Sequence, residues 1–241
     1  MTAGRALIVT ADDFGRTPEI NAGVIAAHRE GIVTSASLMV RWPAAVAAVG
    51  LARGHLGLSL GLHVDLGEWS WDEQDGWQLV YQAVDGDDGQ AVSEEAERQL
   101  AAFRSLTGAN PTHIDSHQHV HRAEPARSVL LAAARTLGVP LRGEDARVRH
   151  CPTFYGQTAE GAPLPQLITP EALMATIRSL PGGVSELGCH PGEGAGMPTA
   201  YDRERADELR ALCDPRVRAC LADEGVSLIS FAELAREGAG D

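Results

Sequence analysis

Cysteine and long apolar runs are scarce in this chain of 241 residues. The four cysteines include no CxxC pair and are too sparse for a disulfide scaffold, so we expect reduced thiols. No apolar run approaches the roughly 20 residues that a membrane-spanning helix needs. The apolar ALIVT near the start is too short for the core of a signal peptide. These absences predict a soluble, cytoplasmic protein with no membrane partner.

Basic residues are also in deficit. The chain has 20 lysines and arginines against 33 aspartates and glutamates, which gives a formal net charge of -13, and no stretch is basic. Proteins that bind nucleic acid or anionic lipid need basic groups to neutralise phosphates, so this composition opposes both partners. A neutral or cationic small molecule is the expected partner.

What the chain does contain is an alternation of short β-rich runs and longer helical patterns, which is typical of βα units around a parallel sheet. Two of the helical patterns begin with Thr-Pro-Glu, at Thr17 and Thr169, where threonine suits the N-cap and proline the first turn. The predicted strands are seven: 6–10, 34–40, 58–66, 112–116, 139–143, 184–190 and 226–231. A chain of this length with 44% hydrophobic residues can bury one core, so we expect an α/β fold in a single domain, 1–241.

Residues 69–92 interrupt the alternation. This segment contains six acidic residues, no basic ones and three of the four tryptophans. We therefore expect it to be a loop-like excursion from the scaffold.

Carboxylates and imidazoles follow several of the predicted strands. ADDFG places Asp12 and Asp13 just after the first strand, and His63 lies near the end of the third. The segment PTHIDSHQHVH, 111–121, puts four of the nine histidines around the end of the fourth strand, and His190 ends the sixth. Because the carboxyl ends of parallel strands form one face of a barrel, where active sites are built, we expect these side chains to converge.

Asp13, His63 and one histidine of the 111–121 cluster would supply one carboxylate and two imidazoles. This set suits Zn²⁺ and leaves a coordination position for water, which the ion would activate to attack a carbonyl. Taken singly, an Asp-Asp pair is more typical of a turn, and a lone histidine of a structural role. Their joint position at successive strand ends favours the metal site. Which histidine of the cluster binds stays open at this point, because a strand and a helix would each place a different pair on one face.

The motifs TADDFG, GIVTSASLMV, GLHVDL, THIDSHQHVH and CHPGE resemble those of the YdjC-like carbohydrate deacetylases, the family that includes chitooligosaccharide deacetylase and a hopanoid-biosynthesis deacetylase. They occur in the family's order across most of the chain. The resemblance implies a distorted, incomplete (β/α) barrel with about seven parallel strands. It also implies one divalent metal ion, with Zn²⁺ favoured and Mg²⁺ as the alternative.

The resemblance further implies roles for individual residues. The metal ligands would be Asp13, His63 and His117, and Asp12 would be the general base. His190 is the candidate general acid, because a histidine tuned near neutrality can protonate a departing amine. The alternative for His190 is that it only orders the turn that follows.

Four further residues are candidates for substrate binding. Asp115 would either accept a hydrogen bond from a metal-bound imidazole or face the substrate. Arg142 would orient substrate hydroxyl or acyl oxygens, with a solvated arginine as the alternative. Trp69 and Trp71, together with Trp77, would form an apolar platform for a sugar ring or be buried under the excursion. The remaining histidines, His119 and His121, would line the rim of the site or pack structurally.

The predicted reaction is hydrolysis of an N-acetyl group on an amino sugar or short N-acetylated glycan, with release of acetate. A metal-dependent phosphoesterase or amidohydrolase is the alternative, but the basic groups or glycine-rich cradle typical of phosphate chemistry are missing from these strand ends. A non-catalytic sugar-binding protein is the third hypothesis. The sequence leaves open whether the substrate is a chitooligosaccharide or a biosynthetic amino-sugar intermediate, and whether the protein is a homodimer.

Overall fold

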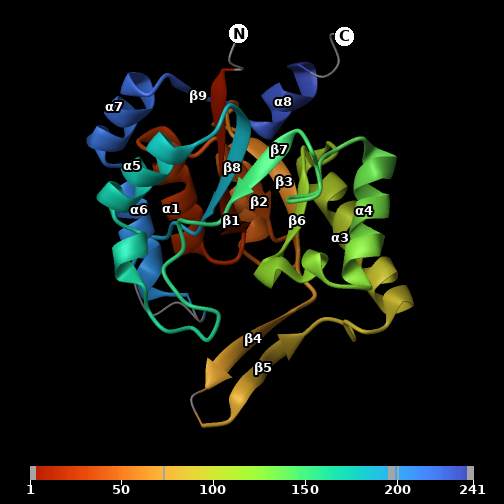
Figure 1. Cartoon of the computed structure of the whole chain (residues 1–241). Helices are drawn as coiled ribbons and strands as arrows, with labels where there is room; N and C mark the ends of the chain where they lie inside the picture. The colour runs from red at the N-terminus through yellow and green to blue at the C-terminus, as the bar shows by residue number, and fades with distance from the viewer. Residues whose placement is uncertain (1–3, 73, 195–198, 200, 238–241) are drawn as a thin grey trace.

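A curled, parallel, seven-stranded sheet forms the centre of the computed structural model, which describes residues 4–72, 74–194, 199 and 201–237 (Figure 1). Its strand order is β6-β3-β2-β1-β8-β7, and β9 also pairs with β1. The strands are β1 (Arg5–Phe14), β2 (Ser35–Leu38), β3 (Ser59–Val64), β6 (Ile114–Ser116), β7 (Val148–Cys151), β8 (Gly183–Cys189) and β9 (Val226–Leu228). The predicted α/β class and incomplete parallel barrel are confirmed.

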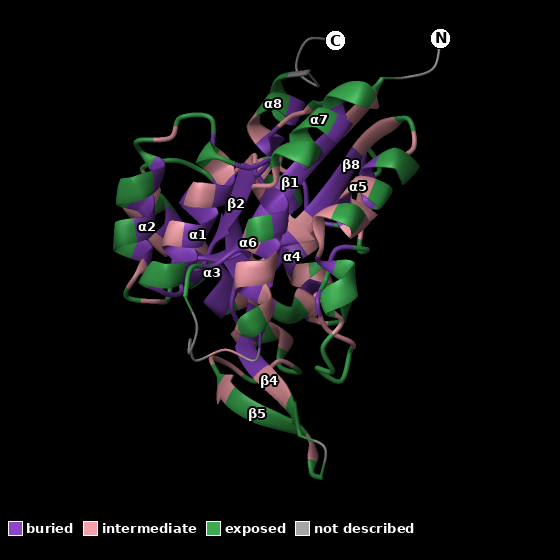
Figure 2. Ribbon diagram, turned by 90° about the vertical axis from the view of Figure 1, so that its left-hand side faces the viewer, coloured by how far each residue is buried: buried purple, intermediate pink, exposed green. Residues whose placement is uncertain are grey.

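Helices cover the sheet and turn their exposed faces outward, while the strands between them are buried (Figure 2). The helices are α1 (Pro18–Arg29), α2 (Ala45–Ala52), α3 (Gly89–Thr107), α4 (Ala126–Leu137), α5 (Pro170–Ser179), α6 (Arg203–Leu212), α7 (Pro215–Asp223) and α8 (Phe231–Glu237), with 3-10 turns at His117–Arg122 and Pro165–Leu167. The Thr-Pro-Glu prediction is confirmed at both sites. Thr17 caps α1 by accepting from the Ile20 N–H, and Thr169 caps α5 by accepting from the Ala172 N–H.

The end of β1 is bent, and the bend presents the two aspartates. The pairing register with β2 shifts between Ala11 and Phe14, and Asp13 has a φ of 62°, which is uncommon for a residue with a side chain. Gly15 follows with a φ of 95°, and a Cβ there would lie 2.9 to 3.1 Å from atoms of β2 and α2. Only glycine fits this close approach. Backbone strain of this kind is typical of functional sites.

The prediction of a strand at 139–143 is wrong. Leu141 forms only an isolated bridge with Ile114, and the chain then turns at Gly143, which has a φ of 74°. Pro140 lacks an N–H to donate to a neighbouring strand, which limits pairing here. The remaining strand of the sheet is instead β7. Its short VRHC sequence has no clear alternation of apolar residues.

The excursion is an antiparallel hairpin rather than a loop. It consists of β4 (Gly67–Asp72) and β5 (Gly76–Gln82), and it projects from the body at the end opposite the chain termini (Figures 1 and 2). Trp69 is paired with Leu79 and Trp71 with Trp77, so the apolar side chains share one face. Asp72, the last residue of β4, accepts two backbone N–H bonds from the turn that precedes β5.

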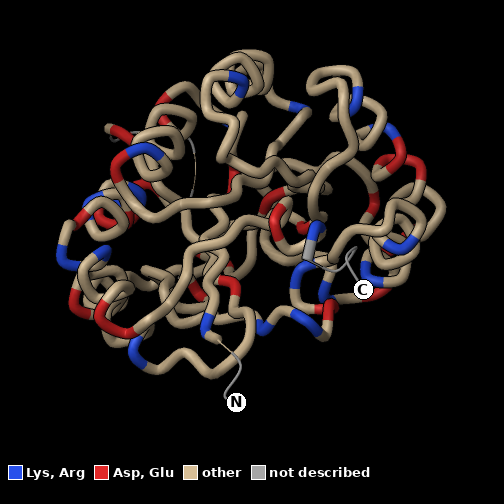
Figure 3. Tube along the Cα trace, turned by 90° about the horizontal axis from the view of Figure 1, so that it is seen from above, with Lys and Arg blue, Asp and Glu red and all other residues tan. Residues whose placement is uncertain are grey.

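Acidic and basic residues are interspersed around the outer helices, as seen from the end of the molecule that carries the termini (Figure 3). Several of them form exposed pairs, such as Arg216 with Glu171 and Arg210 with Asp207. Among the described residues, no helix has both the length and the apolar character needed to cross a membrane.

Candidate metal centre and active site

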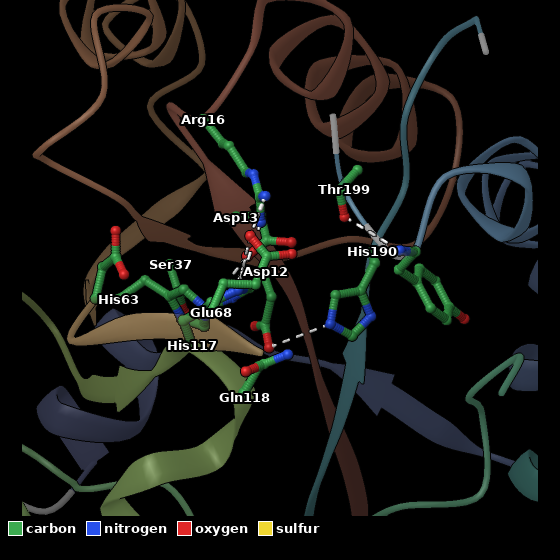
Figure 4. A network of polar contacts seen from close by, with 12 residues as sticks. Asp12, Asp13, Arg16, Ser37, His63, Glu68, His117, Gln118, His190 and Thr199 are labelled. Atoms are coloured by element: carbon green, nitrogen blue, oxygen red, sulfur yellow. Dashed lines mark hydrogen bonds and ion pairs between the residues drawn. The ribbon is translucent and has the colours of Figure 1, made fainter. Parts of the chain in front are cut away.

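Asp13, His63 and His117 converge at the carboxyl end of the sheet, from β1, β3 and the turn after β6 (Figure 4). Asp13 Oδ1 lies 3.0 Å from His117 Nδ1 and 3.4 Å from His63 Nε2, and the three ligating atoms are all within 4.8 Å of one another. All three residues are buried, and Asp13 Oδ1 accepts no hydrogen bond from the described part of the chain. One carboxylate and two imidazoles around an unsatisfied buried oxygen fit a divalent ion.

The environment keeps Asp13 ionised, as a metal ligand must be. Burial by itself would raise its pKa, but the nearby Arg205 guanidinium and the His117 imidazole outweigh this effect and hold the pKa well below its usual range. Arg205 donates to Asp13 Oδ2, so Oδ1 is the oxygen that faces the two histidines.

Asp115 lies behind His63 rather than on the substrate side. Its Oδ1 is 2.7 Å from His63 Nδ1, and its Oδ2 accepts from the Ser37 hydroxyl at 2.6 Å. This contact directs Nε2 of His63 toward Asp13, as carboxylate partners do for metal-binding imidazoles. Asp115 is 0% exposed, so the structure favours the first of its two predicted roles.

The carboxylate of Asp12 is held by Arg142. The guanidinium donates to both carboxylate oxygens of Asp12, at 2.7 and 2.8 Å, and its Nε donates to Glu186 at 2.8 Å. Arg142 also contacts Asp115 at 2.7 Å, and its side chain is 0% exposed. The predicted contact of Arg142 with substrate is therefore not supported, because the guanidinium lies beneath the site and is fully used by carboxylates.

His190 directly follows β8 and lies across Asp12 from His63 and His117 (Figure 4). Its Nε2 is 3.8 Å from Asp12 Oδ2, and its backbone N–H donates to Glu208. The ring lies against Tyr201, with ring centroids 5.0 Å apart, and against Tyr155 at 5.5 Å. The turn that begins at Pro191 thus leaves the imidazole facing the same space as Asp12.

A cavity of about 580 Å³ opens above these groups. Asp12, Asp13, His63, His117 and His190 all line it. The hairpin contributes Trp69, Trp71 and Trp77 to the wall of this cavity, which Tyr155, Tyr201 and Arg205 also line. Trp71 and Trp77 form an edge-to-face pair with centroids 5.5 Å apart and are 39% and 55% exposed. The tryptophans are therefore available to a ligand rather than buried under the hairpin.

The other histidines of the 111–121 cluster have separate surroundings. His113 is fully buried, stacks on Phe231 at 4.1 Å and fills the space left by Gly61, where a Cβ would lie 2.3 Å from its ring. Burial lowers the pKa of His113 to about 4. His121 is buried and bonded to Ser116 at 2.6 Å, whereas His119 lines the cavity with a φ of 54°. His113 and His121 thus pack, and His119 lies at the wall.

Sequence reasoning missed four charged residues that surround the site. Arg16 lies 3.4 Å from His117 Nε2 and forms a buried ion pair with Glu68 at the base of the hairpin. Arg205 and Glu208, on α6, contact Asp13 and the backbone of His190. Arg16 follows Asp13 closely in the motif DFGR, and this short separation in sequence could have placed Arg16 near the site. Arg205 is 192 residues from Asp13, and no local pattern could have linked them.

Comparison with known proteins agrees with this geometry. The chain matches the family model described as YdjC-like protein over residues 6–223. It is 32% identical to a chitooligosaccharide deacetylase from Serratia marcescens, over 95% of this chain and 99% of the relative. It is 34% identical to a carbohydrate deacetylase from Geobacillus stearothermophilus, over 95% and 98% of the two chains.

Solved structures give the same fold. A putative cellobiose-phosphate cleavage protein from Enterococcus faecalis superposes with a TM-score of 0.79 at 25% identity, covering 96% of this chain and 99% of that one. A family 4 carbohydrate esterase from Streptomyces lividans, in complex with acetate, has a TM-score of 0.55 at 15% identity, covers 95% and 93% of the two chains, and supports the fold alone. The chain, as its motifs predicted, belongs to the YdjC-like family.

Proposed function

We propose that this protein is a metal-dependent hydrolase that removes an N-acetyl group from an amino sugar or a short N-acetylated glycan and releases acetate. The observation that carries the proposal is the arrangement of Asp13, His63 and His117 in one cavity with Asp12 and His190. The relatives named as chitooligosaccharide and carbohydrate deacetylases support the choice of bond.

Asp13, His63 and His117 would hold the divalent ion. Their mixed carboxylate and imidazole donors favour Zn²⁺ over Mg²⁺, which prefers oxygen ligands. When bound there, such an ion supplies Lewis acidity toward the acyl oxygen and lowers the pKa of water.

Asp12 is the proposed general base. Arg142 donates one hydrogen bond to each carboxylate oxygen, which fixes the carboxylate and leaves each oxygen a second lone pair for a proton. Asp12 also lies beside the ligating cluster, because it is the neighbour of Asp13 on β1. The base is thus oriented before substrate binds, so little reorganisation is needed at the moment of proton transfer.

His190 is the proposed general acid. It faces the cavity from the side opposite the ligating histidines, so a substrate amide placed between them would present its nitrogen to the imidazole (Figure 4). A proton donated from His190 lets the amine leave as the C–N bond breaks. Glu208 holds the backbone N–H of His190 and so helps to fix the position of the ring.

The hairpin tryptophans are the proposed binding wall for the sugar. Trp69, Trp71 and Trp77 line the cavity from one face of the hairpin. Aromatic faces with little conformational entropy to lose make good contact surfaces for rings.

The phosphoesterase alternative is less favoured by the structure. Each of the buried arginines near the site already contacts a carboxylate: Arg142 contacts Asp12, Arg16 contacts Glu68 and Arg205 contacts Asp13. All 20 basic residues are arginine, so the chain also has no lysine to serve as a phosphate-binding or amine-nucleophile group. Phosphoryl transfer usually recruits several uncompensated cations.

An acetate-release assay tests the proposal. The substrates would be N-acetylglucosamine, short chitooligosaccharides and N-acetylated glycoside intermediates, each assayed with metal-replete and chelator-treated protein. We expect acetate from at least one of them, and only with metal. Metal-replete protein that binds these sugars without releasing acetate would favour a sugar-binding role, and release of phosphate from sugar phosphates would favour the phosphoesterase.

A further inference from the structure

Arg205 is buried at the wall of the cavity with part of its hydrogen-bonding capacity unused. It lies near the start of α6, is 1% exposed and donates to Asp13 through Nη2. Its Nε and Nη1 are buried and have no hydrogen-bond partner among the residues that the structure describes. Unpaired buried donors are destabilising, so proteins that retain them usually satisfy them with a ligand or an ordered water.

The acidic neighbour on the same helix does not satisfy these donors. Glu208 lies three residues further along α6, a spacing at which an arginine and a glutamate often pair. Its two oxygens are occupied elsewhere, since one accepts from the His190 backbone N–H and the other from the Tyr201 hydroxyl. The side chains of Arg205 and Glu208 therefore serve different groups, and the guanidinium keeps its free N–H groups.

The surroundings of Arg205 combine positive charge with an apolar wall. The rings of Tyr155 and Tyr201 stack with centroids 4.8 Å apart, and the guanidinium carbon lies 5.9 Å from the Tyr201 ring centroid. Both tyrosines line the cavity with Arg205, next to His190. A small ligand that carries one carboxylate and a short apolar group matches this combination.

We propose that the free N–H groups of Arg205 bind the carboxylate of the acyl product, with its methyl group against Tyr155 and Tyr201. This inference rests on the proposed function and names a further residue of the same site. Hydrolysis joins the oxygen of water to the acyl carbon, breaks the C–N bond and gives the nitrogen a proton, so a carboxylate exists only after the bond is broken. Arg205 then distinguishes acetate from the neutral amide, because ionised acceptors bind guanidinium more strongly than neutral ones do.

The test measures the binding of acetate and of acetamide by NMR titration, in which the methyl signal of each ligand is monitored. It requires no turnover. Arg205→Lys keeps a cation for Asp13 but loses the planar fork that can serve two carboxylates. We expect its affinity for acetate to fall roughly tenfold or more and its affinity for acetamide to stay unchanged. Arg210→Lys is the matched control, because Arg210 lies on the same helix with its side chain 75% exposed, and it should bind both ligands as the parent protein does.

The metal content of each variant is measured alongside. If Arg205→Lys retains metal, the metal-loaded variant is compared with the metal-loaded parent protein. If it loses metal, the metal-free forms of both proteins are compared, and the same difference in acetate affinity is expected. Equal acetate affinity in Arg205→Lys and the parent protein would overturn the inference and assign the free donors to water. Failure of the proposed function would look different, since the parent protein would then release acetate from no N-acetylated sugar.

Discussion

Asp12 and Asp13 are adjacent in the chain but have different neighbours and different proposed roles, because the backbone bends at Asp13. The positive φ of Asp13 turns its carboxylate toward His63 and His117, while Asp12 faces Arg142. Asparagine substitutions at the two positions can therefore separate the two proposed roles.

Asp12→Asn should keep near-native metal content while the turnover number falls by a factor of roughly 10² to 10⁴, the range typical of a general base. The variant should fold, because Arg142 retains Asp115 and Glu186 as partners. Asp13→Asn should lose both metal and activity. Metal analysis and steady-state kinetics on the two variants check this, and full turnover in metal-replete Asp12→Asn would shift the role of base to another group such as His190.

Alanine at Asp13, His63 or His117 should remove most of the bound metal and abolish turnover. His119→Ala is the control within the same histidine cluster, and it should keep most of the metal because its ring lies outside the ligating group. Metal stoichiometry by elemental analysis decides between the sites. An equal loss in His119→Ala would move the ligand assignment along the cluster.

Asp115→Asn should weaken metal binding by about 10- to 100-fold without removing a ligand, since partners of metal-bound imidazoles typically contribute this much. The physical reason is the 2.7 Å contact that orients His63. A competition titration with a metal-binding dye measures the affinity. Unchanged affinity would show that the orientation of the His63 ring does not depend on the charge of Asp115.

At the scale of elements, the hairpin is attached to the segment that carries a ligating histidine. Gln118, next to His117, accepts from the Trp69 N–H at 2.9 Å and donates to the Trp69 carbonyl at 2.7 Å. Glu68 is tied to Arg16 in the same region. These contacts therefore fix the position of the hairpin relative to the cluster of Asp13, His63 and His117.

Trp71→Ala should raise KM for the best glycan several-fold and leave the turnover number nearly unchanged, because the side chain contributes to binding in the ground state and transition state alike. Val80→Ala is the matched control. Val80 is as exposed as Trp77 and lies on β5 next to Leu79, but it does not line the cavity. An unchanged KM after alanine substitution at each hairpin tryptophan would end the platform hypothesis.

The elements that sequence predicted best are those with local signals. The buried strand around 6–10 has the sequence of an apolar run, and the caps at Thr17 and Thr169 follow from side-chain chemistry. The prediction of a strand at 139–143 was wrong because residues 148–151 pair with the sheet instead, and this pairing depends on tertiary contacts rather than on local composition. The hairpin was missed as a hairpin because acidic turn residues hid its alternation. The charges of α6 were missed because their contacts join opposite ends of the chain.

At the scale of the whole molecule, Arg142 links three carboxylates beneath the site and couples stability to pH. Burial by itself would raise the pKa of Glu186, but Arg142 and His150 together outweigh burial and hold the pKa at about 2, against an ordinary value of 4.5. A lowered pKa gives stability that is fully present above the unfolded value and is lost as the pH falls. Glu186 therefore stabilises the protein above about pH 4.5, and this contribution disappears towards pH 2.

Glu186→Gln should lower the free energy of unfolding at neutral pH and flatten its decline between about pH 4.5 and 2. Urea unfolding at a series of pH values measures both effects. Glu97→Gln, an exposed substitution on α3, is the control and should leave the pH profile as it is. An identical profile in the two variants would contradict the coupling.

The central place of β1 has a consequence for how the chain is made. β1 is translated before the other strands of this sheet, yet it lies between β2 and β8, and β8 begins only at Gly183. The edge of β1 that pairs with β8 therefore has no partner during most of translation. Unpaired edges of this kind promote association with other chains. Nascent chains that stop before β8 should accumulate on chaperones or in inclusion bodies, while those released after β9 should fold.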